Sequence, residues 1–290
     1  MKPLVSFIIT YHNEPEAFLQ TCIESVQTLR LSSEEAEIIV VDDGSEVPPT
    51  FAGREGIQYL RQEQAGLSVA RNTGLNRAQG LYIQFVDADD CLIPSAYEAV
   101  IEQLKTESPD LVLFKMGTKE KECGKRSVLR KCSGAEFLQK HNLRASACAY
   151  VFRREILGDL RFHPGLLHED ELFTPKLFLK VGSLVELDAK PYFYRQHSGT
   201  ITHSKNSLHI QKRLNDTRFV LSELKSLNEP VLKRRLRQLT VDYLQKVLTL
   251  TRSFRELRIR KKELRKEGFL PLPLRCYSLR YFFCALASRI

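Results

Sequence analysis

The chain has 290 residues, of which 43% are hydrophobic and 27% are charged, as in ordinary globular proteins. This composition excludes a disordered chain, a fibrous protein and a disulfide-rich miniprotein. Its apolar runs are far shorter than the ~20 residues of a membrane-spanning helix, and its first residues read as a strand rather than a signal peptide. We expect a cytoplasmic protein, or one attached peripherally to the cytoplasmic face of the inner membrane.

Charge is unevenly distributed along the chain. Residues 205–290 contain 21 Lys and Arg against 7 Asp and Glu, a net charge of +14, whereas residues 1–204 have a net charge of −5. This division predicts a working domain over residues 1–204 and a basic helical extension over residues 205–290. The seven cysteines form no CxxC pair, which favours reduced thiols and argues against a zinc site.

Strand and helix patterns alternate through the first third of the chain. Apolar strands are expected at residues 5–10, 37–41, 57–60 and 81–86, and helices after Pro15, over residues 67–78 and from Pro94. The alternation predicts an α/β fold, with a mostly parallel sheet flanked by helices. Ligands bind such sheets beyond the carboxyl ends of the strands.

Polar clusters follow three of these expected strands, at residues 11–14, 42–43 and 87–90. Asp87 and Asp89 flank one residue after a buried strand, a pattern that can hold a hard divalent cation together with phosphate oxygens. The alternative is a solvated turn in which Asp90 caps the helix that opens at Pro94. The turn alone leaves both interpretations open.

Five segments extend this pattern in order: IIVVDDGS at 38–45, GLSVARN at 66–72, FVDADD at 85–90, LLHEDELF at 166–173 and YRQHSGTIT at 194–202. With them the chain resembles the inverting glycosyltransferases of family 2 over residues 3–204. The resemblance implies a GT-A fold and transfer of a sugar from a nucleotide diphosphate donor, a UDP-sugar, to a hydroxyl of a glycan or lipid-linked acceptor. It also implies Mn²⁺ or Mg²⁺ as cofactor.

The resemblance further implies roles around the nucleotide. Asp43 would accept a hydrogen bond from the imide N–H of uracil, or would only form the turn before Gly44. Thr10, Tyr11 and Glu14 would pack against the base, although a buried strand-end tyrosine is an equal alternative for Tyr11.

The implied donor site continues with Gly66, Arg71 and the turn at Asp87, Ala88 and Asp89. Arg71 would lie near the nucleotide, with an ion pair to Asp43 or Asp87 as the alternative. Asp87 would contact the ribose and assist the metal, and Asp89 would bind the metal directly.

The resemblance places the catalytic base at Asp170, with Glu169 as the substitute if the alignment shifts by one residue. Both residues also fit the start of a helix, and the two roles are compatible. His197 could complete the metal shell or donate to phosphate, and Arg195 is the alternative phosphate contact.

Two other functions match parts of this pattern. A nucleotidyltransferase also places acidic residues at strand ends, but residues 12–15 contain no Gly-rich phosphate loop. The basic C-terminal helices could bind nucleic acid, but their arginines alternate with leucines rather than forming a known reading motif. We therefore expect no nucleic-acid partner.

The basic extension changes character along its length. Residues 231–250 contain an apolar stripe expected to pack on the catalytic domain or on another copy in a homo-oligomer; it consists of Leu232, Leu236, Leu239, Tyr243, Val247 and Leu250. The basic stretch 252–266 and the aromatic end after residue 270 suit attachment to an anionic membrane surface. The alternative is a helical cap with solvated arginines and with Phe282 and Phe283 in its core.

Overall fold

The computed structural model describes residues 2–50, 56–119, 123–196 and 207–289. The chain forms two compact units, one of residues 1–134 and 145–198 and the other of residues 135–144 and 199–290. The second unit thus takes in a short segment, residues 135–144, from the middle of the chain. His197 and the hydroxyl-rich residues that follow it lie outside the described residues.

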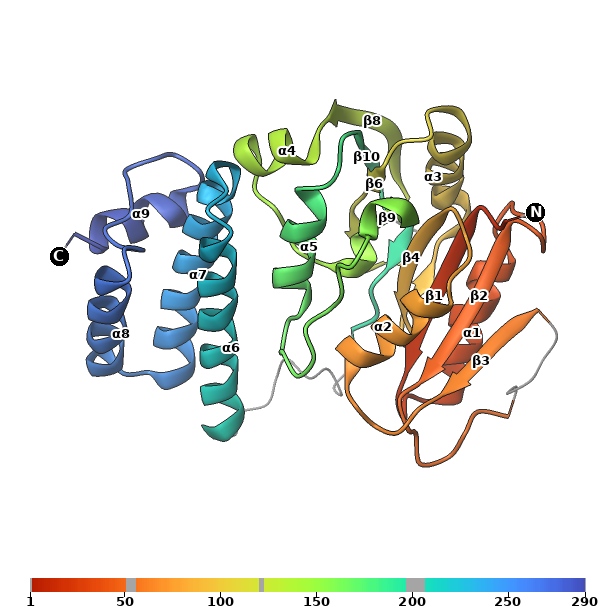
Figure 1. Ribbon diagram of the computed structural model, residues 1–290, viewed down its shortest axis with the longest axis horizontal. Helices are drawn as coiled ribbons and strands as arrows, with labels where there is room; N and C mark the ends of the chain where they lie inside the picture. The colour runs from red at the N-terminus through yellow and green to blue at the C-terminus, as the bar shows by residue number, and fades with distance from the viewer. Residues whose placement is uncertain (1, 51–55, 120–122, 197–206, 290) are drawn as a thin grey trace. The chain divides into compact units, whose positions relative to one another are not determined.

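The first unit is built on a mixed eight-stranded sheet (Figure 1). In spatial order its strands are β3 (Ile57–Arg61), β2 (Ala36–Asp42), β1 (Val5–Tyr11), β4 (Tyr82–Asp87), β9 (Tyr150–Arg153), β6 (Leu111–Leu113), β10 (Leu184–Ala189) and β8 (Gly124–Cys132). Strands β3, β2, β1 and β4 are parallel, whereas β9 and β8 run antiparallel to their neighbours. The expected mostly parallel sheet is confirmed.

The central strands form because their sequences are almost wholly apolar. Every residue of β1 is buried, as expected of a parallel strand covered on both faces. Helices α1 (Glu16–Gln27), α2 (Leu67–Arg77) and α3 (Pro94–Thr106) connect the strands. The chain leaves β1 for β2 and β3 and returns on the other side of β1 as β4. This reversal places a topological switch point, where such sheets bind ligands, between the ends of β1 and β4.

Two glycines fix helix α2 against the sheet. Gly66 precedes the helix with a φ of +91°, a left-handed conformation that favours glycine. A Cβ atom at Gly74 would lie 2.3 Å from Cγ2 of Ile8 in β1. Because any side chain there would collide with β1, the helix can approach the strand this closely only with glycine. The close approach positions Arg71, between the two glycines, over the end of the sheet.

A second, three-stranded sheet in the first unit contains β5 (Cys91–Leu92), β11 (Tyr192–Phe193) and β7 (Met116–Gly117). Strand β5 follows the acidic turn at the end of β4, and β11 pairs with it in antiparallel fashion. Helix α5 (Asp170–Phe178) belongs to the same unit. These short elements bring Glu169, Tyr192 and Arg195 to the end of β4.

The second unit is helical. It contains most of α4 (Gly134–Lys140), together with α6 (Ser207–Ser226), α7 (Lys233–Thr251), α8 (Phe254–Lys266) and α9 (Leu279–Ala287). Helix α7 packs against α6 and α8, and Leu239, Tyr243 and Val247 of the apolar stripe are buried. Helices of the same unit therefore pack against α7, and the expected packing of the stripe on the catalytic domain or on another copy stays a prediction.

The C-terminal helix α9 has two unlike faces. Tyr281 and Ala285 are buried, whereas the residues Leu279 and Phe283 are 81% and 65% exposed. The alternative that placed Phe283 in the core was therefore wrong. Among the described residues, no helix is long and apolar enough to cross a membrane.

Candidate active site

The polar ends of β1, β2 and β4 are adjacent in the structure. Thr10 pairs with Asp87 across β1 and β4, and Tyr11 pairs with Asp42 across β1 and β2. The backbone N–H of Ala88 donates to the carbonyl of Thr10 (3.2 Å), and that of Asp43 donates to the carbonyl of Tyr11 (2.9 Å). The predicted convergence of these clusters at one edge of the sheet is thereby confirmed.

The Asp43 carboxylate organises the segment before α2. Its Oδ1 accepts hydrogen bonds from the Gln62 side chain (2.7 Å) and the Ala65 backbone (2.9 Å), and its Oδ2 accepts one from the Gly66 backbone (2.8 Å). Asp43 is buried, so these donors offset the cost of removing its charge from water. The alternative in which Asp43 only forms the turn before Gly44 is thus incomplete, because its carboxylate also accepts hydrogen bonds from residues 62, 65 and 66.

Tyr11 and Glu14 complete the end of β1. Tyr11 is buried, as the strand-end alternative expected, and burial raises the pKa of its hydroxyl. Glu14 accepts a short hydrogen bond from the His12 backbone (2.6 Å). Burial, assisted by the charges of Asp89 and Asp87, raises the pKa of Glu14 above its usual value.

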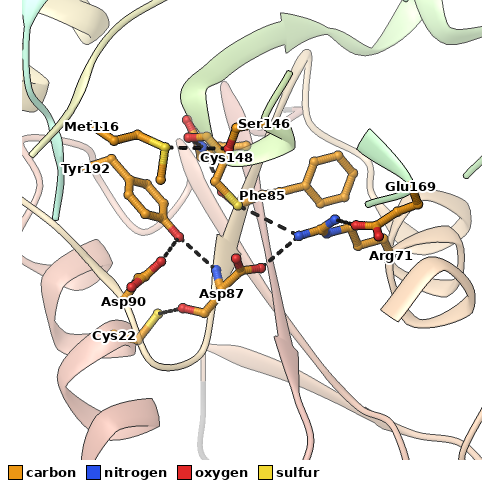
Figure 2. A network of polar contacts seen from close by, with 11 residues as sticks. Cys22, Arg71, Phe85, Asp87, Asp90, Met116, Ser146, Cys148, Glu169 and Tyr192 are labelled. Atoms are coloured by element: carbon orange, nitrogen blue, oxygen red, sulfur yellow. Dashed lines mark hydrogen bonds and ion pairs between the residues drawn. The ribbon is translucent and has the colours of Figure 1, made fainter. Parts of the chain in front are cut away.

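Arg71 lies at the centre of an ionic network (Figure 2). One guanidinium nitrogen contacts Oδ1 of Asp87 at 2.9 Å, and the other forms an ion pair with Glu169. The guanidinium carbon lies 5.7 Å from the ring centre of Phe85 and 5.4 Å from that of Phe162. Burial works against the charge, but the two carboxylates outweigh it and raise the pKa of Arg71. The alternative pairing of Arg71 with Asp87 is confirmed, and its pairing with Glu169 was not foreseen.

Helix α5 begins at the predicted base. Glu169 is its N-cap residue and Asp170 its first residue, so the expected helix start is confirmed. Phe173 in this helix stacks on Phe162 with ring centres 3.8 Å apart and planes at 10°. Glu169 is buried and bound to Arg71, whereas Asp170 is only half-buried. The Glu169 side chain is thus engaged by Arg71, while Asp170 lies at the first position of the helix.

Asp90 does not cap helix α3, and that expectation was wrong. The N-cap residue is Ile93, which has no side-chain capping hydrogen bond. Asp90 is instead buried, and its carboxylate accepts hydrogen bonds from the Tyr192 hydroxyl (2.7 Å) and the Arg195 backbone (2.8 Å). Burial and the neighbouring Asp87 and Asp89 carboxylates raise the pKa of Asp90 to about 8.

The side chain of Arg195 is bound to the same turn. Its Nε donates to the carbonyl of Asp89 (2.8 Å), and its guanidinium carbon lies 4.5 Å from the ring centre of Phe18 and 5.6 Å from that of Phe193. These contacts place a positive charge beside the acidic turn, where the diphosphate of a nucleotide is expected.

The donor set at the end of β4 fits a hard cation that is shared with a ligand. Among the described residues, no group of three His, Cys, Asp or Glu side chains could hold a metal alone. Mg²⁺ and Mn²⁺ commonly use one or two carboxylates together with substrate phosphates. The side chain of Asp87 is 35% exposed, and with Asp89 it could supply those carboxylates.

Tyr192 belongs to the same network and was not foreseen from the sequence. Its ring is buried, and its hydroxyl contacts both Asp90 and the backbone N–H of Asp87. The available signal was the aromatic run at 192–194 just before the segment that contains His197.

Comparisons with known proteins agree with this geometry. S. aureus TarS (residues 1–349, in complex with UDP-GlcNAc) superposes with a TM-score of 0.64 at 20% identity, covering 99% of this chain and 80% of that one. At this identity the likeness establishes the fold, which is the GT-A fold predicted above. The model described as "Glycosyl transferase family 2" matches residues 6–160.

The chain therefore belongs to glycosyltransferase family 2. The uncharacterized glycosyltransferase EpsJ of Bacillus subtilis is 31% identical over 222 residues, which are 70% of this chain and 64% of EpsJ. Glycosyltransferase GlyG of Streptococcus pneumoniae is 24% identical over 299 residues, covering 90% of this chain and 96% of GlyG. The chain thus spans just under two thirds of EpsJ and nearly all of GlyG. Family membership favours neither a nucleotidyltransferase nor a nucleic-acid-binding protein.

Proposed function

We propose that this chain is a metal-dependent inverting glycosyltransferase. It would move a sugar from a UDP-sugar to a hydroxyl of a glycan or a lipid-linked acceptor. The main support is that Arg71 joins Asp87, in the acidic turn, to Glu169, beside the predicted base, at one edge of the sheet. TarS, which has a similar fold, is described in complex with UDP-GlcNAc and with UDP, which supports a uridine nucleotide as donor.

The nucleotide would lie over the ends of β1, β2 and β4. Asp43 would accept from the uracil imide N–H, with Thr10, Tyr11 and Glu14 beside the base. Asp43 already holds the Gly66 backbone, so uracil recognition and the start of α2 would be coupled. The turn at Asp87, Ala88 and Asp89 would receive the ribose and the diphosphate.

The transfer step would use Asp170. As the acceptor oxygen bonds to the anomeric carbon, its proton passes to the Asp170 carboxylate. The bond from that carbon to the phosphate oxygen breaks on the opposite face, and UDP leaves with the electron pair, which inverts the configuration. Because Arg71 is committed to Asp87 and Glu169, its role in this step would be to hold both elements in place.

The departing diphosphate needs compensating charge. Mn²⁺ or Mg²⁺, held by Asp87 and Asp89 with His197 as a further candidate ligand, would supply that charge. Arg195 lies next to the same turn and would add a fixed positive charge near the phosphates.

The helical unit would attach the enzyme to an anionic membrane surface at the cytoplasmic face. Residues 205–290 have a net charge of +14, and α9 exposes Leu279, Phe283 and Leu286. Basic residues beside exposed apolar side chains suit an anionic leaflet. Attachment would bring the site close to a lipid-linked acceptor.

Two measurements test the proposed activity. Calorimetry should detect UDP binding that requires Mn²⁺ and is abolished by EDTA, and a donor panel that includes UDP-GlcNAc should yield UDP from one activated sugar. Failure to bind UDP, together with tight binding of duplex DNA at moderate salt, would reject the proposal in favour of a nucleic-acid-binding protein.

A further inference from the structure

Tyr192 spans the two ends of the acidic turn with a single hydroxyl group. This hydroxyl donates to Oδ2 of Asp90 (2.7 Å) and accepts from the backbone N–H of Asp87 (3.1 Å), as Figure 2 shows. The Tyr192 side chain is fully buried, and burial raises the pKa of its hydroxyl. The hydroxyl therefore stays protonated and serves as donor and acceptor at once.

The segment that carries Tyr192 is itself fixed to the chain that leaves the turn. Tyr192 pairs with Leu92 and Phe193 with Cys91. The backbone N–H of Ile93 donates to the carbonyl of Pro191 (2.8 Å). Because both strands are tied in this way, the hydroxyl cannot shift without moving the strand that continues the turn.

Two contacts of Arg195 hold the middle and the end of the turn. Its backbone N–H donates to Oδ1 of Asp90 (2.8 Å), and its Nε donates to the carbonyl of Asp89 (2.8 Å). Residues 192 and 195 thus contact Asp87, Asp89 and Asp90, although they lie about a hundred residues further along the chain.

This arrangement gives the three acidic side chains of the turn different positions. Three carboxylates within four residues repel one another, and a flexible turn could present any of them to a ligand. The Asp90 carboxylate is held inside the protein by Tyr192 and Arg195, whereas the Asp87 side chain is 35% exposed. The inward position of Asp90 leaves the outer face of the turn to Asp87 and Asp89.

We propose that Tyr192 is a positioning residue, whose hydroxyl fixes the Asp87–Asp90 turn in the conformation that receives the diphosphate and its cation. This inference rests on the proposed function, because it takes the turn to be the diphosphate site. Tyr192 would act through Asp87 and Asp90 and would touch neither the nucleotide nor the sugar.

The test replaces Tyr192 with phenylalanine in the full chain, which keeps the ring and removes the hydroxyl. Calorimetry in Mn²⁺ should show about tenfold weaker UDP binding, as expected for one lost hydrogen-bonding centre. The Mn²⁺ concentration for half-maximal UDP binding should rise. Uridine, which lacks the diphosphate, should bind as tightly as to the wild type by ligand-observed NMR.

Tyr97→Phe is the matched control. Tyr97, in α3, is also fully buried, but its hydroxyl has no hydrogen-bond partner in the described part of the chain. Tyr97→Phe should bind UDP with wild-type affinity and wild-type Mn²⁺ dependence. If Tyr192→Phe does not fold, Asp90→Ala removes the same contact from the other side and should weaken UDP binding in the same selective way.

Two results would overturn the inference. One is wild-type UDP affinity and Mn²⁺ dependence in Tyr192→Phe; the other is an equal loss of uridine and UDP binding, which would indicate general loosening of the domain. In both cases the proposed function still stands, because the wild type binds UDP. Absence of UDP binding by the wild type would instead reject the proposed function, and the inference with it.

Discussion

Arg71 and Glu169 are 98 residues apart in the sequence and form an ion pair in which their side chains are only 5% and 8% exposed. Arg71 belongs to α2, and Glu169 is the N-cap residue of α5. The same guanidinium contacts Asp87 at the end of β4 (Figure 2). One arginine therefore fixes the start of the helix that carries the predicted base relative to the acidic turn.

The first prediction concerns the stability of this pair. Glu169→Ala should lower the free energy of unfolding by about 3–5 kcal/mol, because it removes one of the two carboxylates that neutralise a buried guanidinium. Urea denaturation measures the change. Glu136→Ala is the control: its ion pair with Lys140 is exposed, so the loss should stay below about 0.5 kcal/mol. An equal loss of stability in the two variants would show that the buried ion pair stabilises the fold no more than an exposed one.

The second prediction separates the base from its neighbour. Asp170→Asn should reduce turnover by roughly 10²–10⁴ because it removes the proton acceptor, while UDP binding should remain. Release of UDP from the donor, followed over time, gives turnover. Glu171→Gln, one residue further along α5, should stay active. If Asp170→Asn is active and Glu169→Gln is not, the base is Glu169; if both are active, the base lies elsewhere.

The third prediction concerns recognition of the base by Asp43. Asparagine presents an amide donor in place of one carboxylate oxygen, so it suits the acceptor edge of cytosine better than the imide N–H of uracil. Asp43→Asn should lower the ratio of UDP to CDP affinity by about tenfold. It should also destabilise the fold by about 1–3 kcal/mol through a lost contact with residues 62–66. An unchanged UDP to CDP ratio would rule out base recognition by Asp43.

The fourth prediction concerns thiol reactivity. Burial raises the pKa of the Cys22 and Cys148 thiols well above the usual value, so they stay protonated and unreactive at neutral pH. Cys276 is exposed and should react quickly with Ellman's reagent. Cys276→Ser should remove a fast phase, and Cys22 and Cys148 should react only after unfolding. Rapid labelling of Cys22 or Cys148 in the folded chain would contradict their buried placement.

The fifth prediction tests membrane attachment. The protein should sediment with vesicles that contain anionic lipid, and added salt should weaken this binding. The double variant Leu279→Ser, Phe283→Ser should bind such vesicles much less, because both side chains are exposed and apolar. Val47→Ser, at an exposed apolar residue of the first unit, should bind like the wild type. Equal binding to neutral and anionic vesicles, or no binding at all, would favour a helical unit with solvated arginines.

The sequence by itself determined the order of the elements through the first third of the chain and the edge of the sheet at which the site lies. Strand β1 was recognisable because most of its residues are apolar, and α3 because Pro94 suits a first helical turn. The acidic residues after β2 and β4 were placed correctly because carboxyl ends of parallel strands share one edge. All these signals are local, since each lies within a few residues of the element that it defines.

Only the tertiary structure decided which partners the polar side chains have. The pairing of Arg71 with Glu169, the inward position of Asp90 against Tyr192 and the cover over the stripe of α7 each join segments distant in the sequence. The sequence indicates that a buried carboxylate needs a hydrogen-bond donor or a positive charge beside it. It does not indicate which of the several donors in the chain will be that partner. The choice is made when the sheet and its helices pack, because burial then makes an unpaired charge too costly to keep.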